Sequence, residues 1–136
     1  MNLSELSIDD FTSPIDIIAH PDDSIHQIKK KIKTVSYRHI PVVSKGVVVG
    51  ILSDRDFKIL QLIPDNQDVR IREIMQDDVY TVFEGSRMED VAFEMSQRKI
   101  GSAVVKKTNG EVEGIFTTTD ALNALIEILR GDVNEN

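Results

Sequence analysis

The 136-residue sequence contains no cysteine and no tryptophan, and aromatic residues make up only 5% of it. Without cysteine the chain can form no disulfide and carry out no thiolate chemistry, which fits the cytosol. The sequence also lacks a hydrophobic run of membrane-spanning length, and its first residues, MNLSELSIDDF, have neither the basic nor the apolar region of a signal peptide. These absences predict a soluble, cytoplasmic protein.

Basic residues are in the minority as well. The chain has 16 lysines and arginines against 23 aspartates and glutamates, for a formal net charge of -7. This balance disfavours non-specific binding to nucleic acid or to an anionic membrane, so an anionic ligand would need a locally basic pocket. The lysine-rich stretch from Lys29 to Lys33 alternates with apolar residues and is interpreted as the solvated face of a helix rather than as a nucleic-acid site.

The chain does contain an internal duplication. GILSDRD, from Gly50 to Asp56, returns as GIFTTTD, from Gly114 to Asp120. The preceding runs RHIPVV, from 38 to 43, and IGSAVV, from 100 to 105, also correspond, at spacings of about 62 to 64 residues. One supersecondary unit is therefore predicted to occur twice.

Each copy shows the hydrophobic pattern of a strand, a helix, two strands joined by a short turn, and a second helix. Asn109-Gly110 is typical of the hairpin turn, and Gly131 is typical of a left-handed helix cap. The predicted elements lie at 11–18, 25–35, 38–43, 47–52 and 54–62 in the first copy, and at 75–82, 88–95, 100–105, 112–116 and 120–130 in the second.

This pattern predicts an α+β protein built from two β-α-β-β-α repeats. We expect the first repeat over 6–63, a linker over 64–70, the second repeat over 71–130 and a disordered tail over 131–136. A unit of about 60 residues buries too little surface to be more than marginally stable alone. The two repeats are therefore expected to pack together with pseudo-two-fold symmetry, which would create two equivalent clefts.

The repeated segment ends in a hydroxyl residue with an aspartate three positions later. We call Ser53 to Asp56 the first turn and Thr117 to Asp120 the second turn. Such a pattern commonly caps a helix, since the hydroxyl accepts from the free amides of its first turn. The same groups could bind a nucleotide, because helix amides and a hydroxyl suit phosphate and a carboxylate can accept both hydrogen bonds of a ribose diol. Both interpretations remain open on the residues alone.

Taken together, RHIPVV with GILSDRDF and IGSAVV with GIFTTTDAL, each preceded by a strand and a helix, resemble a tandem pair of cystathionine-β-synthase (CBS) domains. The resemblance extends from about Leu6 to Leu129. It implies a regulatory module that binds an adenosyl ligand such as AMP, ADP, ATP or S-adenosylmethionine. Similar modules commonly form homodimers and regulate a separate protein or domain, and the partner regulated here is unknown.

The resemblance also implies roles for individual residues. Asp56 and Asp120 would hold ribose hydroxyls, and their turns would face phosphate. The candidate nucleotide-binding residues are Ile15, Arg38, His39, Ser53, Arg55, Asp56, Val79, Thr117 and Asp120. Among these, Ile15 and Val79 would line the adenine pocket. The second copy has Ile100 and Gly101 where the first has Arg38 and His39, so a phosphorylated ligand is predicted at the first turn.

Two other functions are weighed against this one. The first is a ligand-free structural or dimerisation module in which both turns only cap helices. The second is an enzyme acting on a nucleotide, which is disfavoured because no nucleophile, base and orienting group recur together. The three histidines have no metal-ligand spacing, and the carboxylate pair of Asp54 and Asp56 is not repeated in the second copy. No catalytic residue, metal or catalytic cofactor is therefore predicted.

Overall fold

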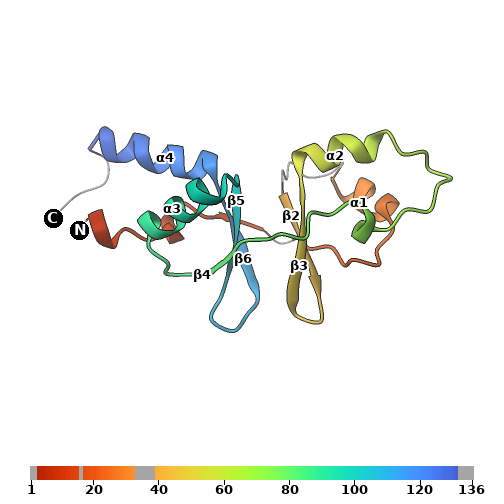
Figure 1. The fold of residues 1–136 in the computed structure, drawn as a ribbon, viewed down its shortest axis with the longest axis horizontal. Coiled ribbons are helices and arrows are strands. Elements are labelled where there is room, and N and C mark those ends of the chain that lie inside the picture. Colours follow the sequence, from red (N-terminus) through yellow and green to blue (C-terminus); the bar gives the residue numbers. More distant parts are fainter. Residues whose placement is uncertain (1–2, 16, 33–38, 132–136) are drawn as a thin grey trace. The chain divides into compact units, whose positions relative to one another are not determined.

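The computed structural model describes residues 3–15, 17–32 and 39–131 of the chain, and Figure 1 labels α1 to α4 and β2 to β6. The elements are η1 (Leu3–Glu5), η2 (Ile8–Asp10), β1 (Ser13–Pro14), α1 (Ile25–Ile32), β2 (His39–Ser44), β3 (Val47–Ser53), α2 (Asp54–Gln61), η3 (Ile71–Glu73), β4 (Thr81–Phe83), α3 (Met88–Arg98), β5 (Ser102–Lys106), β6 (Val112–Thr117) and α4 (Thr118–Leu129). The protein is thus α+β, as the sequence predicts.

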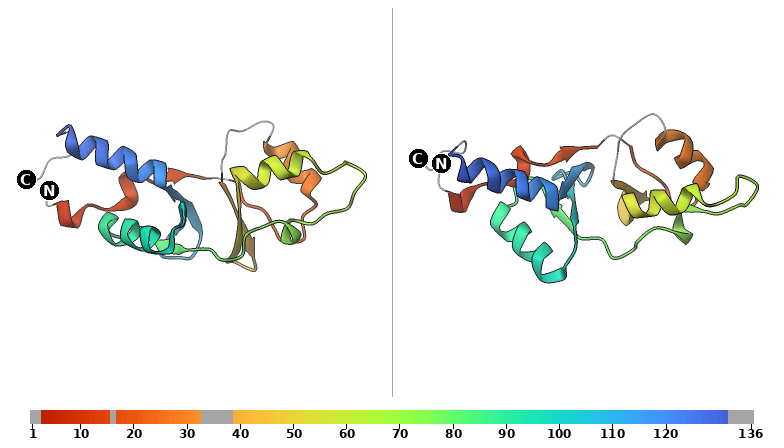
Figure 2. Two further views of the ribbon diagram at one scale, coloured as in Figure 1. Left: turned by 45° about the horizontal axis from the view of Figure 1, so that its top comes forward. Right: turned by 90° about the horizontal axis from the view of Figure 1, so that it is seen from above.

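The described residues form two compact units. One combines 3–15 with 80–131, and the other comprises 17–32 and 39–79. The N-terminal segment, red in Figure 2, lies beside α3 and α4 in both views although most of it belongs to the first repeat in the sequence. The packing units therefore do not coincide with the predicted repeats 6–63 and 71–130. The boundaries of the repeats are defined by sequence similarity and stay a prediction.

The unit of 3–15 and 80–131 contains a four-stranded sheet in the order β1-β6-β5-β4. β4 is parallel to β5, with Thr81 opposite Val104, and β5 is antiparallel to β6, with Val104 opposite Ile115. β1 pairs antiparallel with the other edge of β6, where Ser13 lies opposite Ile115. A short strand from the start of the chain thereby completes the sheet of the second repeat.

The other unit repeats this arrangement in a reduced form. β2 and β3 form an antiparallel pair in which Ile40 lies opposite Leu52. Single bridges continue the pattern on both sides, since Ala19 is parallel to Val42 and Gln76 is antiparallel to Ile51. The segment around Gln76 thus lies along one edge of β3. This position corresponds to that of β1 along the edge of β6.

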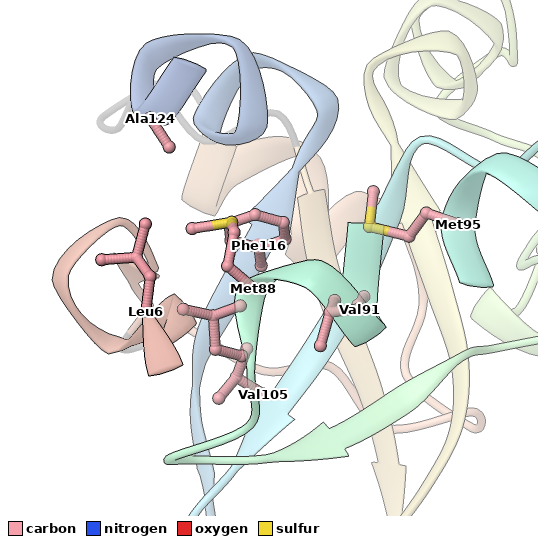
Figure 3. Close-up of a cluster of buried hydrophobic side chains, with 9 residues drawn as sticks. Leu6, Met88, Val91, Met95, Val105, Phe116 and Ala124 are labelled. Carbon is pink, nitrogen blue, oxygen red and sulfur yellow. The ribbon is translucent and has the colours of Figure 1, made fainter. Parts of the chain in front are cut away.

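Each unit has its own hydrophobic core, formed where the apolar faces of its helices meet the sheet. Figure 3 shows Leu6, Met88, Val105 and Phe116 converging in the unit of 3–15 and 80–131. The buried residues of this core are Leu6, Ile8, Met88, Val91, Met95, Ala103, Val105, Phe116 and Ala124. The buried residues of the second core are Ala19, Ile25, Ile28, Ile40, Val42, Leu52, Phe57, Leu60 and Ile71.

Most predicted elements are confirmed, with shifts of a few residues at their ends. Gly110 and Gly131 have φ values of +92° and +76°, so the predicted turn and helix cap both adopt the left-handed region. The predicted loop and short strand within 11–18 correspond to β1, which comprises Ser13–Pro14. Beyond it, the Ile15 amide still donates to the Glu113 carbonyl at 3.5 Å.

Three other expectations concern residues that lie outside the described part of the chain. They are the basic residue Arg38, the end of the first helix beyond Ile32 and the tail from 132 onward. Among the described residues, no helix has both the length and the apolar character needed to cross a membrane.

Candidate functional site

The first turn begins α2 and orients a buried carboxylate. Ser53, the residue before the helix, is extended, with φ -107° and ψ 174°. Oδ2 of Asp56 accepts hydrogen bonds from the Ser53 amide at 2.8 Å and from the Ser53 hydroxyl at 3.1 Å. Although it is charged, Asp56 is only 6% exposed. A buried carboxylate is costly unless it is hydrogen-bonded, so these bonds keep it in a fixed position.

The second turn has the same geometry at the start of α4. Oδ2 of Asp120 accepts from the Thr117 amide at 2.8 Å and from the Thr117 hydroxyl at 3.0 Å. In return, the Asp120 amide donates to the Thr117 hydroxyl at 3.2 Å, which completes a capping box. Asp120 is 9% exposed, and it and Asp56 are the buried charged residues in the described part of the chain. Both turns therefore cap helices and bury a carboxylate.

The two carboxylates differ in their second oxygen. Oδ1 of Asp120 accepts a hydrogen bond at 3.2 Å from the hydroxyl of Ser13, the first residue of β1. At Asp56, both hydrogen bonds from Ser53 go to Oδ2, and no hydrogen bond corresponding to that of Ser13 comes from the paired edge residue Gln76. Ser13 could not be identified from the sequence, because the contact depends on pairing between β1 and β6, segments about 100 residues apart. The capping bonds of the first turn thus leave Oδ1 of Asp56 unused.

A glycine in each return strand permits the close approach of these edge segments. A side chain at Gly114 would overlap the Ser13 carbonyl oxygen, and one at Gly50 would come within 2.5 Å of the Met75 sulfur. The absence of a side chain at both glycines therefore allows the neighbouring segment to lie close against the strand. Each brings a segment of the neighbouring edge next to a turn.

Ile15 and Val79 lie in different units. Ile15 belongs with Thr117 and Asp120, and its amide donates to the Glu113 carbonyl at 3.5 Å. Val79 is half-buried and belongs with the first turn. The second turn is therefore in one unit with Ile15, which leads into the first strand of the first repeat. The first turn is in one unit with Val79, which leads into the first strand of the second repeat.

Tyr80 follows Val79 at the start of the second repeat. Its ring lies under the Arg98 guanidinium, 4.6 Å from the ring centre. Burial raises the pKa of the phenol, and the Glu94 carboxylate raises it further. This phenol therefore stays protonated near neutral pH and does not supply a base.

The predicted cations are placed unevenly. His39 of β2 lies opposite Ser53 of β3, so the register brings the histidine beside the first turn. Arg55 is exposed in the first turn of α2, and Arg38 lies outside the described residues. In the second repeat, the Gly101 carbonyl at the matching place accepts from the Thr118 amide at 3.0 Å. The two copies thus differ at this position: a histidine lies beside the first turn, and a glycine without a side chain takes its place at the second turn.

Within 3–15, 17–32 and 39–131, no three histidine, aspartate or glutamate side chains gather in a way that could hold a metal ion.

The chain was compared with known proteins. The sequence profile described as CBS domain matches residues 8–61 and 71–127. An uncharacterised protein of the archaeon Methanocaldococcus jannaschii, MJ1225, is 32% identical over 127 residues, covering 85% of this chain and 45% of the relative. A second relative from this archaeon, MJ1232, is also 32% identical, and 30% of its length is covered. The chain thus spans less than half the length of these two relatives.

Solved structures show the same fold. The CBS domain pair of protein MJ0100, in complex with 5'-methylthioadenosine and S-adenosyl-L-methionine, is 28% identical, with a TM-score of 0.69 and coverage of 93% of this chain and 98% of that one. A structure of CBSX2 in complex with AMP has a TM-score of 0.70 at 21% identity, with coverage of 92% and 99%. At the latter identity the likeness concerns the fold alone.

Proposed function

The chain belongs to the CBS domain family, and on this premise we propose that it is a regulatory module that binds an adenosyl ligand and has no catalytic activity of its own. The ligand is AMP, ADP, ATP or S-adenosylmethionine. The ligand binds first at the turn of Ser53 and Asp56, and its binding changes the affinity of the module for a protein partner. We also propose that this regulatory module acts in the cytoplasm.

One observation carries the proposal: the cap of the buried Asp56 carboxylate uses one of its two oxygens. Both hydrogen bonds from Ser53 go to Oδ2, so the cap itself leaves Oδ1 available. A ribose hydroxyl would donate to this oxygen in the way that a buried carboxylate requires. The complex of the MJ0100 domain pair with two adenosyl compounds supports this ligand class.

A phosphorylated ligand favours the first turn over the second. The amides and hydroxyl at the start of α2 suit an anion, and His39 lies across from Ser53. Arg55 adds an exposed positive charge one residue before Asp56. At the second turn, glycine replaces the histidine, so a less charged adenosyl compound would suit that turn better.

A second candidate function is a module that binds no ligand. It is favoured by the capping bonds themselves, since both aspartates already serve the helices that they begin. In this case the module would act only by association. The two candidates differ in whether a small molecule stabilises the native state.

The proposal is tested by a thermal-shift screen with AMP, ADP, ATP, S-adenosylmethionine and NAD, followed by calorimetric titration. A ligand that binds only the folded protein raises its melting temperature, by an amount that grows with concentration. We expect an increase with at least one of the first four compounds. Mass spectrometry of small molecules released from the purified protein shows whether a ligand accompanies it. No shift and no released adenosyl compound would favour the ligand-free module, and turnover of a nucleotide would favour an enzyme.

Ligand control would act by differential affinity. A ligand changes a conformational or association equilibrium only by binding one state more tightly than another. The partner must therefore bind the ligand-loaded and ligand-free forms with different affinities, and the coupling is reciprocal. Measuring ligand affinity with and without a candidate partner would reveal this coupling.

We also propose that the protein forms a homodimer through α4. Large apolar side chains are exposed at a helical spacing on this helix: Leu122, Leu125, Ile126 and Leu129. A stripe of this kind is unusual on a free surface. A second copy of the chain is the natural occupant because it offers the same apolar stripe.

Replacing both Leu125 and Leu129 by aspartate is expected to dissociate this dimer. The solution mass by light scattering should fall from about twice the chain mass to the 15.3 kDa of one chain. The matched control is Phe93→Asp, which adds charge at an exposed apolar residue of α3 in the same unit. A monomeric wild-type protein, or dissociation by the control alone, would contradict the assignment to α4.

A further inference from the structure

We propose that Ser13 is a built-in competitor at the second turn, where its hydroxyl occupies the position on Asp120 that a ligand's ribose hydroxyl would take. This inference rests on the proposed function, because it concerns the same kind of site in the other repeat. It explains how two turns of the same geometry come to differ in affinity. The competitor is a segment of the chain itself.

The hydrogen bonds of Asp120 leave neither carboxylate oxygen without a donor. Oδ2 receives the Thr117 amide and hydroxyl, at 2.8 and 3.0 Å, and Oδ1 receives the Ser13 hydroxyl at 3.2 Å. A ribose hydroxyl and a serine hydroxyl are the same kind of donor, and both bind a carboxylate oxygen. A ligand that uses Oδ1 of Asp120 must therefore compete with Ser13.

The backbone holds Ser13 where this competition is possible. Ser13 lies opposite Ile115 in the ladder between β1 and β6, and Pro14 lies opposite Gly114. Because Gly114 has no side chain, the backbone of Ser13 can lie directly against it. The Thr12 hydroxyl donates to the Ile8 carbonyl at 2.9 Å, which anchors the preceding residue. The Ser13 residue itself is exposed, so its hydroxyl can rotate toward water when a ligand arrives.

At the first turn, the edge segment that pairs with the return strand offers no such competitor. Gln76 lies opposite Ile51 as Ser13 lies opposite Ile115. The backbone of Gln76 bonds to Ile51 in both directions, at 2.9 and 3.0 Å, and its exposed side chain makes no hydrogen bond to Asp56. The paired edge segment therefore supplies a competing donor at the second turn but not at the first. Ligand therefore fills the first turn at lower concentration.

The test uses Asp56→Asn as the background, so that the first turn no longer contributes, and 5'-methylthioadenosine as an uncharged probe with an intact ribose. Calorimetry compares this background with the added change Ser13→Ala. A hydrogen bond to a charged group is worth about a factor of ten or more, so we expect Ser13→Ala to tighten binding about tenfold. Adding Asp120→Asn should abolish the gain.

Two controls complete the set. Thr12→Val removes the neighbouring hydroxyl, which bonds to Ile8 rather than to Asp120, and should leave the affinity unchanged. Ser13→Cys keeps the side-chain size with a weaker donor and should give an intermediate affinity, even if Ser13→Ala lowers the melting temperature.

The outcomes separate this inference from the proposed function. If Ser13→Ala leaves the affinity unchanged or weakens it while wild-type binding depends on Asp56, Ser13 is not a competitor and only this inference fails. If neither the wild type nor any variant binds an adenosyl compound, both proposals fail together.

Discussion

Replacing Asp56 by asparagine is expected to lower the affinity for the proposed adenosyl ligand about 10- to 100-fold and to leave the melting temperature of the ligand-free protein nearly unchanged. The amide oxygen of asparagine can still accept from the Ser53 amide, so the helix start is kept. The amide nitrogen takes the place of Oδ1, where a ribose hydroxyl would then meet a donor instead of an acceptor. Calorimetric titration and thermal unfolding measure the two effects separately.

Asp120→Asn is the matched control, because Asp120 makes the same cap bonds at the second turn. We expect a similar small change in melting temperature but little change in the affinity of the first turn. Equal losses of affinity in both variants would show that the turns act together. An Asp56→Asn protein that binds as tightly as the wild type would assign Asp56 to helix capping alone.

Phe116→Ala is expected to cause the largest loss of stability, about 3 to 5 kcal/mol. Phe116 is fully buried in the core that also contains Leu6 and Ile8. The destabilised core should expose the amides of 3–15 together with those of 80–131, although the two segments are far apart in the sequence. Hydrogen exchange measured by mass spectrometry follows both segments in one experiment.

Leu60→Ala provides the comparison in the other core, where Leu60 is fully buried on α2. It should raise exchange in 17–32 and 39–79, and the effect on 3–15 should be smaller. The pattern discriminates between the packing units and the predicted repeats. If exchange of 3–15 follows Leu60→Ala and not Phe116→Ala, the N-terminal segment packs with the first repeat instead.

The sequence was sufficient to predict the local structure, because local structure follows from short-range patterns. Apolar residues at helical spacing in Ile25 and Ile28 gave α1, and the Asn109-Gly110 pair gave the turn between β5 and β6. The pairing of Ser13 with Ile115 could not be predicted in this way. Periodicity shows that a segment is extended but does not identify the strand that it will join.

The same distinction between short-range patterns and long-range pairing applies to the residues of the candidate site. Repetition of a hydroxyl and an aspartate at one spacing was enough to find both buried carboxylates, Asp56 and Asp120. His39 was named from the family resemblance alone, and its position opposite Ser53 was seen only in the strand register. The contact between Ser13 and Asp120 was missed, because a lone serine in a leading segment carries no pattern.

The helix-capping role of each aspartate has a consequence for interpreting related sequences. Because Asp56 and Asp120 both hold the beginning of a helix in place, a descendant that had lost its ligand would still be penalised for losing either residue. The motif can therefore outlive the activity with which it is associated. The groups around Oδ1 of the aspartate are the better guide to whether a given copy still binds a ligand.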